Sequence, residues 1–204
     1  PHHGADFNRD GWLDLATGDY AAGNLSVFLN DGQGSYLPPF NLPGGSFIRG
    51  VATGDFDGDG YHDIAAGNGA TTLIWLNDGT GGFLPSTGYA NGQTNPSAEL
   101  NVVDVNEDGY DDVGVGAPNA APQVLQAQGL AYIYLGSGTG VEATAIVVSP
   151  HAPASHQLFG RSITHGRDVN DDAFVDASSP SPGYGLSLIH FSLVCLYHAP
   201  CTPH

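Results

Sequence analysis

Four short acidic segments of the chain carry side chains suited to binding a divalent cation. Each segment follows the pattern D-x-[DN]-x-D-G-x-x-D, with one departure at the glycine of the fourth segment. Positions 1, 3, 5 and 9 supply side-chain oxygens, and position 7 can supply its backbone carbonyl. Calcium takes about six to eight oxygen ligands in a flexible shell, which a tight turn with alternating carboxylates can provide. The predicted calcium ligands are Asp6, Asn8, Asp10, Trp12 and Asp14; Asp55, Asp57, Asp59, Tyr61 and Asp63; Asp104, Asn106, Asp108, Tyr110 and Asp112; and Asp168, Asn170, Asp172, Phe174 and Asp176.

Position 6 of each loop must turn the chain sharply. Gly11, Gly60 and Gly109 fill this position in the first three loops, where a residue without Cβ enters the positive φ region at little cost. Ala173 replaces glycine in the fourth loop, which should strain the bend by about 1 kcal/mol. The fourth site is therefore predicted to be the weakest.

Two other interpretations of the loops fit the sequence less well. An EF-hand needs a bidentate glutamate at position 12 and helices on both sides, whereas position 12 holds Thr17, Ala66, Val115 and Ser179. Alternatively, Asp-Gly pairs are common in turns that bind no metal. Four copies with a carboxylate at position 9 and an aromatic residue at position 7 favour calcium. Because crowded carboxylates repel one another without the ion, the metal is predicted to serve the stability of the fold.

The loops are the clearest part of a longer internal repeat. They start at residues 6, 55, 104 and 168, which gives units of 6–54, 55–103 and 104–167 and a partial fourth unit from 168. Residues 177–204 form an atypical C-terminal tail. A second shared element follows the first two loops, where Val27–Tyr36 and Ile74–Phe83 each combine an apolar run with an Asn-Asp-Gly turn. Such a run and turn are typical of a strand that enters a hairpin.

Short strands with one signature loop in each unit indicate an all-β protein. Residues 51–56 and 63–67 are further predicted strands, and 30 glycines with 14 prolines leave little room for helices. Units of this length fit a β-propeller blade, a four-stranded antiparallel sheet, better than a sandwich. The predicted fold is a partial propeller of about three to four blades.

The charge of the chain excludes some partners. It has 21 Asp and Glu residues against four Arg and no Lys, a formal net charge of −17. No basic surface exists to neutralise phosphates, so nucleic acid is not expected as a partner. The longest apolar stretch, 186–199, is interrupted by His190 and His198 and is too short for a membrane span. The first residues do not resemble a secretory signal.

Catalytic motifs are absent from the sequence, and the chain is not predicted to be an enzyme. There is no Gly-x-Ser-x-Gly element and no P-loop, and the calcium loops account for the clustered carboxylates. Cys195, His198, Cys201 and His204 are spaced unlike a structural zinc site, which favours a disulfide or two unrelated thiols.

Two features of the sequence concern possible sugar chemistry. Trp12, Trp75, Tyr132 and Tyr134 could stack on a sugar, but aromatic residues in strands are more often part of the core. Asn24 begins an Asn-Leu-Ser glycosylation sequon between two predicted strands, which is consistent with a surface loop of a glycoprotein.

The repeats resemble the FG-GAP and VCBS repeats of integrin α-subunit-like β-propellers. Units one and two are similar to the VCBS form, through residues 55–60 and 76–83, and unit three to the FG-GAP form, through residues 116–118, 131–140 and 159–160. The resemblance covers residues 6–176. It implies a secreted or cell-surface propeller, often with seven blades, whose calcium loops lie on one face. The opposite face or the blade junctions would bind protein or carbohydrate.

Three functions follow as hypotheses. The first is a calcium-binding extracellular module for adhesion or for recognition of protein or carbohydrate. The second is a structural subunit whose blade edges pack into an assembly or filament, because under four blades leave sheet edges without a partner. The third is the non-catalytic propeller of a carbohydrate-active enzyme. A fragment, an assembly subunit and a propeller completed by another copy all fit the length of the chain.

Overall fold

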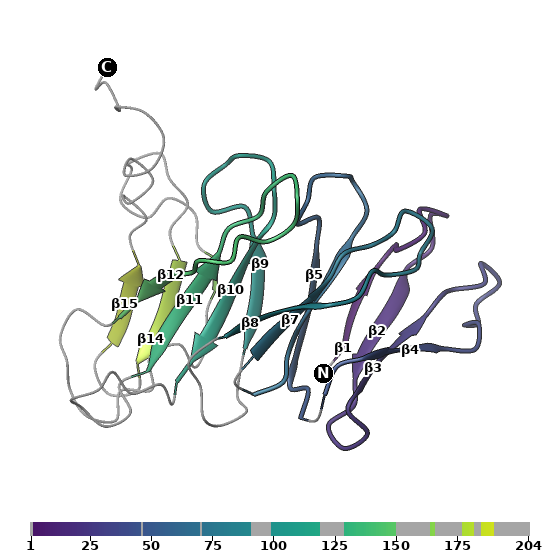
Figure 1. The fold of residues 1–204 in the computed structure, drawn as a ribbon, viewed down its shortest axis with the longest axis horizontal. Coiled ribbons are helices and arrows are strands. Elements are labelled where there is room, and N and C mark those ends of the chain that lie inside the picture. Colours follow the sequence, from purple (N-terminus) through teal and green to yellow (C-terminus); the bar gives the residue numbers. More distant parts are fainter. Residues whose placement is uncertain are drawn as a thin grey trace.

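The computed structural model describes residues 2–45, 47–69, 71–90, 99–118 and 129–149, and the backbone of three short strands within 164–189. All secondary-structure elements of these residues are strands. They form four antiparallel sheets that lie side by side in chain order (Figure 1). The all-β prediction is confirmed. The described residues contain no helix that is long and apolar enough to cross a membrane.

Each of the first three sheets is a four-stranded meander in which neighbours in sequence are neighbours in the sheet. The first contains β1 (His2–Ala5), β2 (Asp14–Gly18), β3 (Asn24–Phe28) and β4 (Phe40–Pro43). The second contains β5 (Gly50–Gly54), β6 (Asp63–Gly67), β7 (Thr71–Trp75) and β8 (Thr87–Ala90). The third contains β9 (Leu100–Val103), β10 (Asp112–Ala117), β11 (Leu130–Tyr134) and β12 (Ile146–Val148).

A fourth sheet pairs β13 (Thr164–His165), β14 (Ala177–Ser181) and β15 (Gly185–Ile189). Two of its strands lie within residues 177–204, for which the sequence predicts an atypical tail. The antiparallel meander therefore continues past the fourth acidic segment.

The acidic loops occupy the same place in each of the first three sheets. Each loop joins the first strand to the second, so that loop position 9 is the first residue of β2, β6 or β10. The repeat units counted from the loops thus start one strand later than the sheets do. Strands on both sides of each described loop agree with the rejection of an EF-hand.

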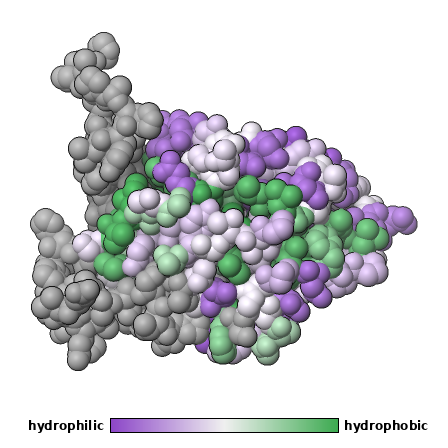
Figure 2. Space-filling view, in the orientation of Figure 1, coloured by the Kyte–Doolittle hydropathy of each residue, from purple (hydrophilic) through white to green (hydrophobic). Residues whose placement is uncertain are grey.

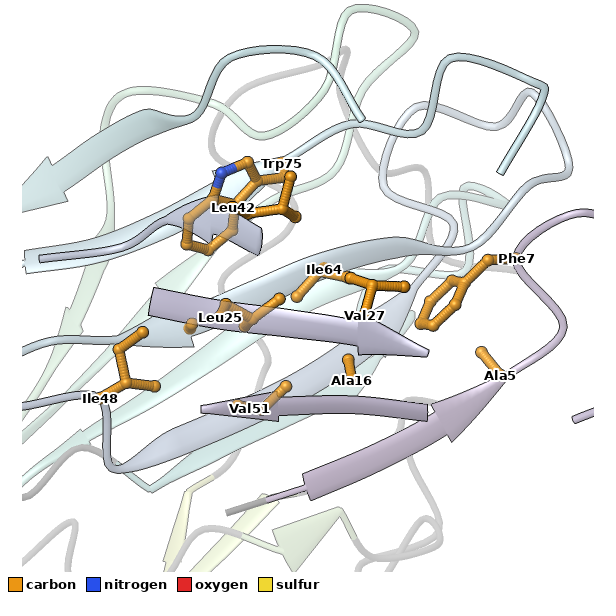
Figure 3. Packing of buried hydrophobic residues seen from close by; sticks show 11 residues of the cluster. Ala5, Phe7, Ala16, Leu25, Val27, Leu42, Ile48, Val51, Ile64 and Trp75 are labelled. Atoms are coloured by element: carbon orange, nitrogen blue, oxygen red, sulfur yellow. The ribbon is translucent and has the colours of Figure 1, made fainter. Parts of the chain in front are cut away.

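The hydrophobic core lies between the sheets. In the first cluster, Phe7, Leu25 and Val27 of the first sheet meet Ile64 and Trp75 of the second, and all five side chains are buried (Figure 3). Burial of one such side chain contributes about 1.5–3 kcal/mol, so the contact between sheets is a main source of stability. Alternate residues of the central strands face opposite neighbours, as the two-residue period of a strand requires.

A second cluster joins the second and third sheets in the same way. Tyr134 is buried here, as Trp75 is in the first cluster, and Tyr132 is partly buried. The core interpretation is thereby confirmed for these aromatic residues. It is wrong for Trp12, which lies at position 7 of the first acidic loop, outside the strands, and is 52% exposed.

Strand β3 begins at Asn24, the residue of the glycosylation sequon. Asn24 pairs with Pro43 of β4, and its carbonyl accepts a hydrogen bond from Asp19. It therefore lies at the start of a strand, and not in the surface loop that the sequence predicts. Glycosylation at this residue stays a prediction.

Candidate metal sites in the acidic loops

In each of the three described loops, burial decreases in the same order, from position 9 at the base through positions 1 and 3 to position 5 at the rim. The carboxylates at position 9, Asp14, Asp63 and Asp112, are fully buried. The residues at positions 1 and 3 are half-buried, and those at position 5 are exposed. Each loop is therefore a small bowl with a buried carboxylate at its base and oxygen side chains above it.

Backbone amides of each loop fold it around its own acidic side chains. In the second loop the amide of Gly60 donates to Asp55 Oδ2 at 2.8 Å, and the amide of Tyr61 donates to Asp59 Oδ1 at 2.7 Å. The equivalent bonds in the first and third loops are 2.8 and 2.9 Å for the glycine and 2.9 and 3.0 Å for the aromatic residue. The spacing of the acids thus determines one common loop shape.

Two positions of this loop shape need a left-handed backbone. Gly60 at position 6 has a φ of 86°, and Gly11 and Gly109 have similar values, which confirms the role predicted for this glycine. Position 4 also has a positive φ, and here Arg9 and Glu107 adopt a φ of 57°. A non-glycine residue in this region costs about 1 kcal/mol, a strain that the repeat pattern did not indicate.

Replacing Glu107 with glycine is expected to raise the free energy of unfolding by about 0.5–1 kcal/mol, because it relieves that strain. Glu107 is exposed and no side-chain hydrogen bond of the described residues involves it. Glu107→Ala serves as the control, since alanine removes the carboxylate and keeps the strain. Urea unfolding in excess calcium measures both variants, and equal stability of the two would contradict the prediction.

The position 9 carboxylates also connect distant parts of each sheet. Asp63 Oδ2 accepts a hydrogen bond from the amide of Phe56, and Oδ1 accepts one from the amide of Asn77, both at 2.8 Å. Asp14 and Asp112 make the same pair of bonds at 2.7–2.8 Å. One donor is always loop position 2, and the other follows the third strand of the sheet. The buried carboxylate therefore fixes the loop to the hairpin beside it.

Burial makes these carboxylates hard to ionise when no cation is bound. It raises the pKa of Asp63 and of Asp112 to about 7, although the two backbone amides on each lower it. Burial also raises the pKa of Asp14, and nearby Asp10 and Asp6 act in the same direction. A bound divalent cation would favour the ionised form of all three.

The second loop fits a cation best. Oxygens of Asp55, Asp57 and Asp63 all lie within 4.8 Å of one another. Oδ1 of Asp55 is buried and has no hydrogen-bond partner in the described structure. A buried, unpaired carboxylate oxygen is costly unless an ion or water satisfies it. The three carboxylates can therefore hold a divalent cation, with Asp59 available at the rim.

Neighbouring loops are tied to one another across the sheets. Asp111 Oδ2 accepts a hydrogen bond from the amide of Asp55 at 2.9 Å, and the amide of Asp111 donates to the Asp55 carbonyl at 2.9 Å. Arg9 of the first loop donates to the carbonyl of Gly60, and its guanidinium lies 4.3 Å from the ring centre of Tyr61. The three loops therefore form one row along the same end of the sheets.

The structure thus places the first three predicted ligand sets in equivalent loops. The fourth set, Asp168 to Asp176, and the Cys and His residues of the tail lie outside the described residues. Sequence reasoning missed the tie made by Asp111 and the amides that meet position 9. A signal for the latter existed, because Asn30 and Asn77 recur after the third strand of the first two sheets. In the third sheet Gly136 takes that place, where a Cβ would lie 2.5 Å from the carbonyl of Asp111.

The family model and the similar proteins agree on one family. A family model described as FG-GAP-like repeat matches residues 6–66 and again residues 55–115. Integrin alpha-7 of Homo sapiens is 33% identical over 171 residues, which cover 76% of this chain and 14% of that protein. Integrin alpha-PS5 of Drosophila melanogaster is 27% identical over 180 residues, or 78% of this chain and 16% of that protein. The chain spans less than a fifth of the length of these relatives.

A solved structure shares the fold at low sequence identity. It is a lectin of Agrocybe aegerita that recognises non-reducing terminal N-acetylglucosamine. The match has a TM-score of 0.57 and 18% identity, and it covers 86% of this chain and 45% of the lectin. The likeness supports the arrangement of the sheets alone.

Proposed function

The chain belongs to the FG-GAP-like repeat family, and from this premise we propose that it is a calcium-binding β-propeller module for extracellular adhesion or recognition. The integrin α subunits among its relatives support a role related to adhesion. Calcium would bind the residues at positions 1, 3, 5, 7 and 9 of each loop and would mainly stabilise the sheets. Protein or carbohydrate would be the ligand, and no reaction would be catalysed.

One observation carries the calcium proposal. Asp55 has a buried oxygen without a partner, and that residue belongs to a group of three carboxylates within 4.8 Å. Carboxylate oxygens are the ligands that calcium prefers, and a flexible loop suits its large and variable shell. The first and third loops share the loop shape but have Asn8 and Asn106 in place of Asp57, so calcium is proposed there on the shape and the remaining acids alone.

Isothermal titration calorimetry with calcium tests the proposal, and the second loop is expected to bind most tightly. It has Asp57 at position 3, where the first and third loops have Asn8 and Asn106. Affinity in calcium loops rises with the charge of the ligand set, so the expected difference is about tenfold.

Two reciprocal variants make that comparison sharp. Asp57→Asn should weaken the tightest site by about tenfold, and Asn106→Asp should strengthen the third site by a similar factor. Each change keeps the size of the side chain and the other loops act as internal controls. Absence of any calcium uptake would refute the proposed metal function, and unchanged affinities in both variants would refute the ranking of the sites.

A specific surface favours the second candidate function, a subunit that packs through its blades. On the second and third sheets, the pairs Ile64 with Trp75 and Val113 with Tyr134 are buried against the preceding sheet. The equivalent pair on the first sheet is Leu15 with Phe28, and both are only partly buried.

Loop position 8 contacts the preceding sheet in the third loop, whereas it is exposed in the first and second loops. Asp111 contacts the preceding sheet through Asp55, whereas the equivalent Leu13 is 61% exposed. Tyr36 lies beside Phe28, with ring centres 6.4 Å apart, and is 49% exposed. Hydrophobic side chains also reach the surface over the first sheet in Figure 2, on its right-hand side. This outward face of the first sheet has the chemistry of a face that receives another blade.

Replacing Leu13 with aspartate is therefore expected to weaken self-association by about tenfold or more, if subunits pack through this face. Val147→Asp is the matched control, because Val147 is 55% exposed on β12. Sedimentation velocity over a range of concentrations in calcium measures the association. A monomer at every concentration, or equal loss in both variants, would argue against the assembly.

A further inference from the structure

A cluster of two aromatic residues and one arginine lies at the end of the strands opposite the acidic loops. Tyr20 lies in the turn between β2 and β3, and Phe47 and Arg49 lie in the connection from β4 to β5. Strand β2 starts at the first loop and ends beside this turn, so the full length of the strand separates the two. We call these three residues the Arg49 cluster.

The side chains of the Arg49 cluster contact one another. The Arg49 guanidinium lies 4.9 Å from the ring centre of Tyr20, and its NH2 group donates to the Tyr20 hydroxyl at 3.1 Å. The Tyr20 and Phe47 rings meet edge to face with their centres 5.1 Å apart. Both rings are 47% exposed, and Arg49 is exposed as well. The surface therefore presents two aromatic rings and a guanidinium side by side.

The backbone holds the Arg49 cluster in place. The amide of Phe47 donates to the Tyr20 carbonyl at 3.0 Å, and the amide of Arg49 donates to the carbonyl of Gly67 in the second sheet at 3.0 Å. Between them Ile48 is fully buried in the core. Phe47 has a φ of 70°, an unfavourable value for an aromatic residue, and about half of its side chain is exposed. Glycine would adopt this backbone more easily, so the phenylalanine is held in a strained position beside Tyr20 at the surface.

Among the described residues, no carboxylate pairs with the charge of Arg49. The chain has 21 acidic residues and four arginines, yet no carboxylate of the described residues forms an ion pair with Arg49. Tyrosine and arginine are also the residue types that most often dominate binding energy in protein interfaces. The guanidinium is thus an exposed donor beside an apolar surface, with several N–H groups available.

We propose that the Arg49 cluster binds the carboxylate of an acidic peptide segment, with Tyr20 and Phe47 covering an apolar residue next to it. This inference rests on the proposed recognition function and names its site and ligand class. A planar guanidinium binds a carboxylate through two parallel hydrogen bonds. Exposed aromatic rings give the apolar neighbour a contact that costs little conformational entropy.

A single acidic residue in an otherwise neutral peptide suits this surface better than a polyanion does. The chain has a formal net charge of −17, which repels sulfated glycans and nucleic acids, and the cluster has one guanidinium. A lone carboxylate flanked by apolar groups limits that repulsion and uses both parts of the site.

Nuclear magnetic resonance titration tests the site with two peptides, acetyl-Phe-Asp-Phe-amide and acetyl-Phe-Asn-Phe-amide, in excess calcium. The aspartyl peptide is expected to bind at least about fivefold more tightly and to shift the Arg49 Nε–H signal. Arg49→Gln should abolish the preference for the aspartyl peptide. Phe47→Gly should weaken binding about tenfold while the melting temperature stays the same or rises, because the strained backbone relaxes.

Leu84→Ala is the matched control, since it removes a hydrophobic side chain of similar exposure from the connection between β7 and β8. Equal affinity for the two peptides, or a preference that survives Arg49→Gln, would overturn the inference. A sialylated oligosaccharide that binds through Arg49 in place of the peptide would overturn it too. Binding of a ligand that does not depend on Arg49 would overturn the inference but leave the recognition function in place. Calcium uptake without binding of any tested peptide or glycan would refute both the inference and the recognition function.

Discussion

Replacing Asp63 with alanine is expected to lower the free energy of unfolding by about 3–5 kcal/mol in the presence of calcium. The side chain is fully buried, and its two oxygens accept the amides of Phe56 and Asn77. Each buried amide left without an acceptor costs about 1–3 kcal/mol, and the variant also loses a ligand of the proposed ion. Calcium cannot restore the two lost hydrogen bonds, so the deficit should persist at any calcium concentration.

Asp59→Ala in the same loop is the control for metal binding alone. Asp59 is exposed, and its side chain accepts the Tyr61 amide at the rim, while its own backbone amide, which alanine keeps, donates to Asp57. Its removal should weaken calcium binding at the second loop, and its effect on stability should shrink when calcium is in large excess. Chemical unfolding at low and high calcium separates the two cases. Equal losses for Asp63→Ala and Asp59→Ala would contradict the structural role of the buried carboxylate.

Removal of calcium is expected to destabilise the protein strongly, and more so at high pH. An ion present at about 100 times its dissociation constant stabilises a folded site by about 2.7 kcal/mol, or about 8 kcal/mol for three such sites. In the metal-free protein, burial raises the pKa of Asp63 and Asp112 to about 7, above the ordinary value of 3.8. Stability that depends on these protons is complete below pH 4 and is lost as the pH rises through 7.

Melting curves at several pH values, with excess chelator and with excess calcium, measure this linkage. The melting temperature of the metal-free protein should fall between pH 5 and pH 8, and the increase produced by calcium should grow over the same range. Magnesium is the control ion, because it demands a small octahedral shell and should stabilise less. A metal-free melting temperature that rises with pH, or no effect of the chelator, would contradict the prediction.

The repeated loops made the fold and most of the candidate site predictable from the sequence. Regular spacing of Asp6, Asp55 and Asp104 indicated one strand, turn and strand per unit, and the structure has that order. The glycine at position 6 was predictable because its φ depends on a local turn. These features are local, so the residues that determine them lie within nine positions of one another.

The features that were missed depend on residues far apart in the chain. Asp111 meets Asp55 across 56 residues, and Trp12 is exposed because no described sheet covers the outer face of the first one. The strained backbone of Glu107 was also not evident, because glycine occurs at that position in the second loop alone among the three described. Packing between neighbouring sheets, which no single loop encodes, determines the first two.

The meander order of the sheets affects how the chain can fold as the ribosome releases it. All strands of each four-stranded sheet come from a continuous segment of about 40 to 50 residues, so each sheet can pair before the next has been synthesised. The side-chain Nδ2 of Asn77 then donates to the carbonyl of Phe7 at 2.9 Å and joins the second sheet to the first. Growth would thus proceed one blade at a time from the N-terminal end, with the newest apolar face exposed until its successor emerges.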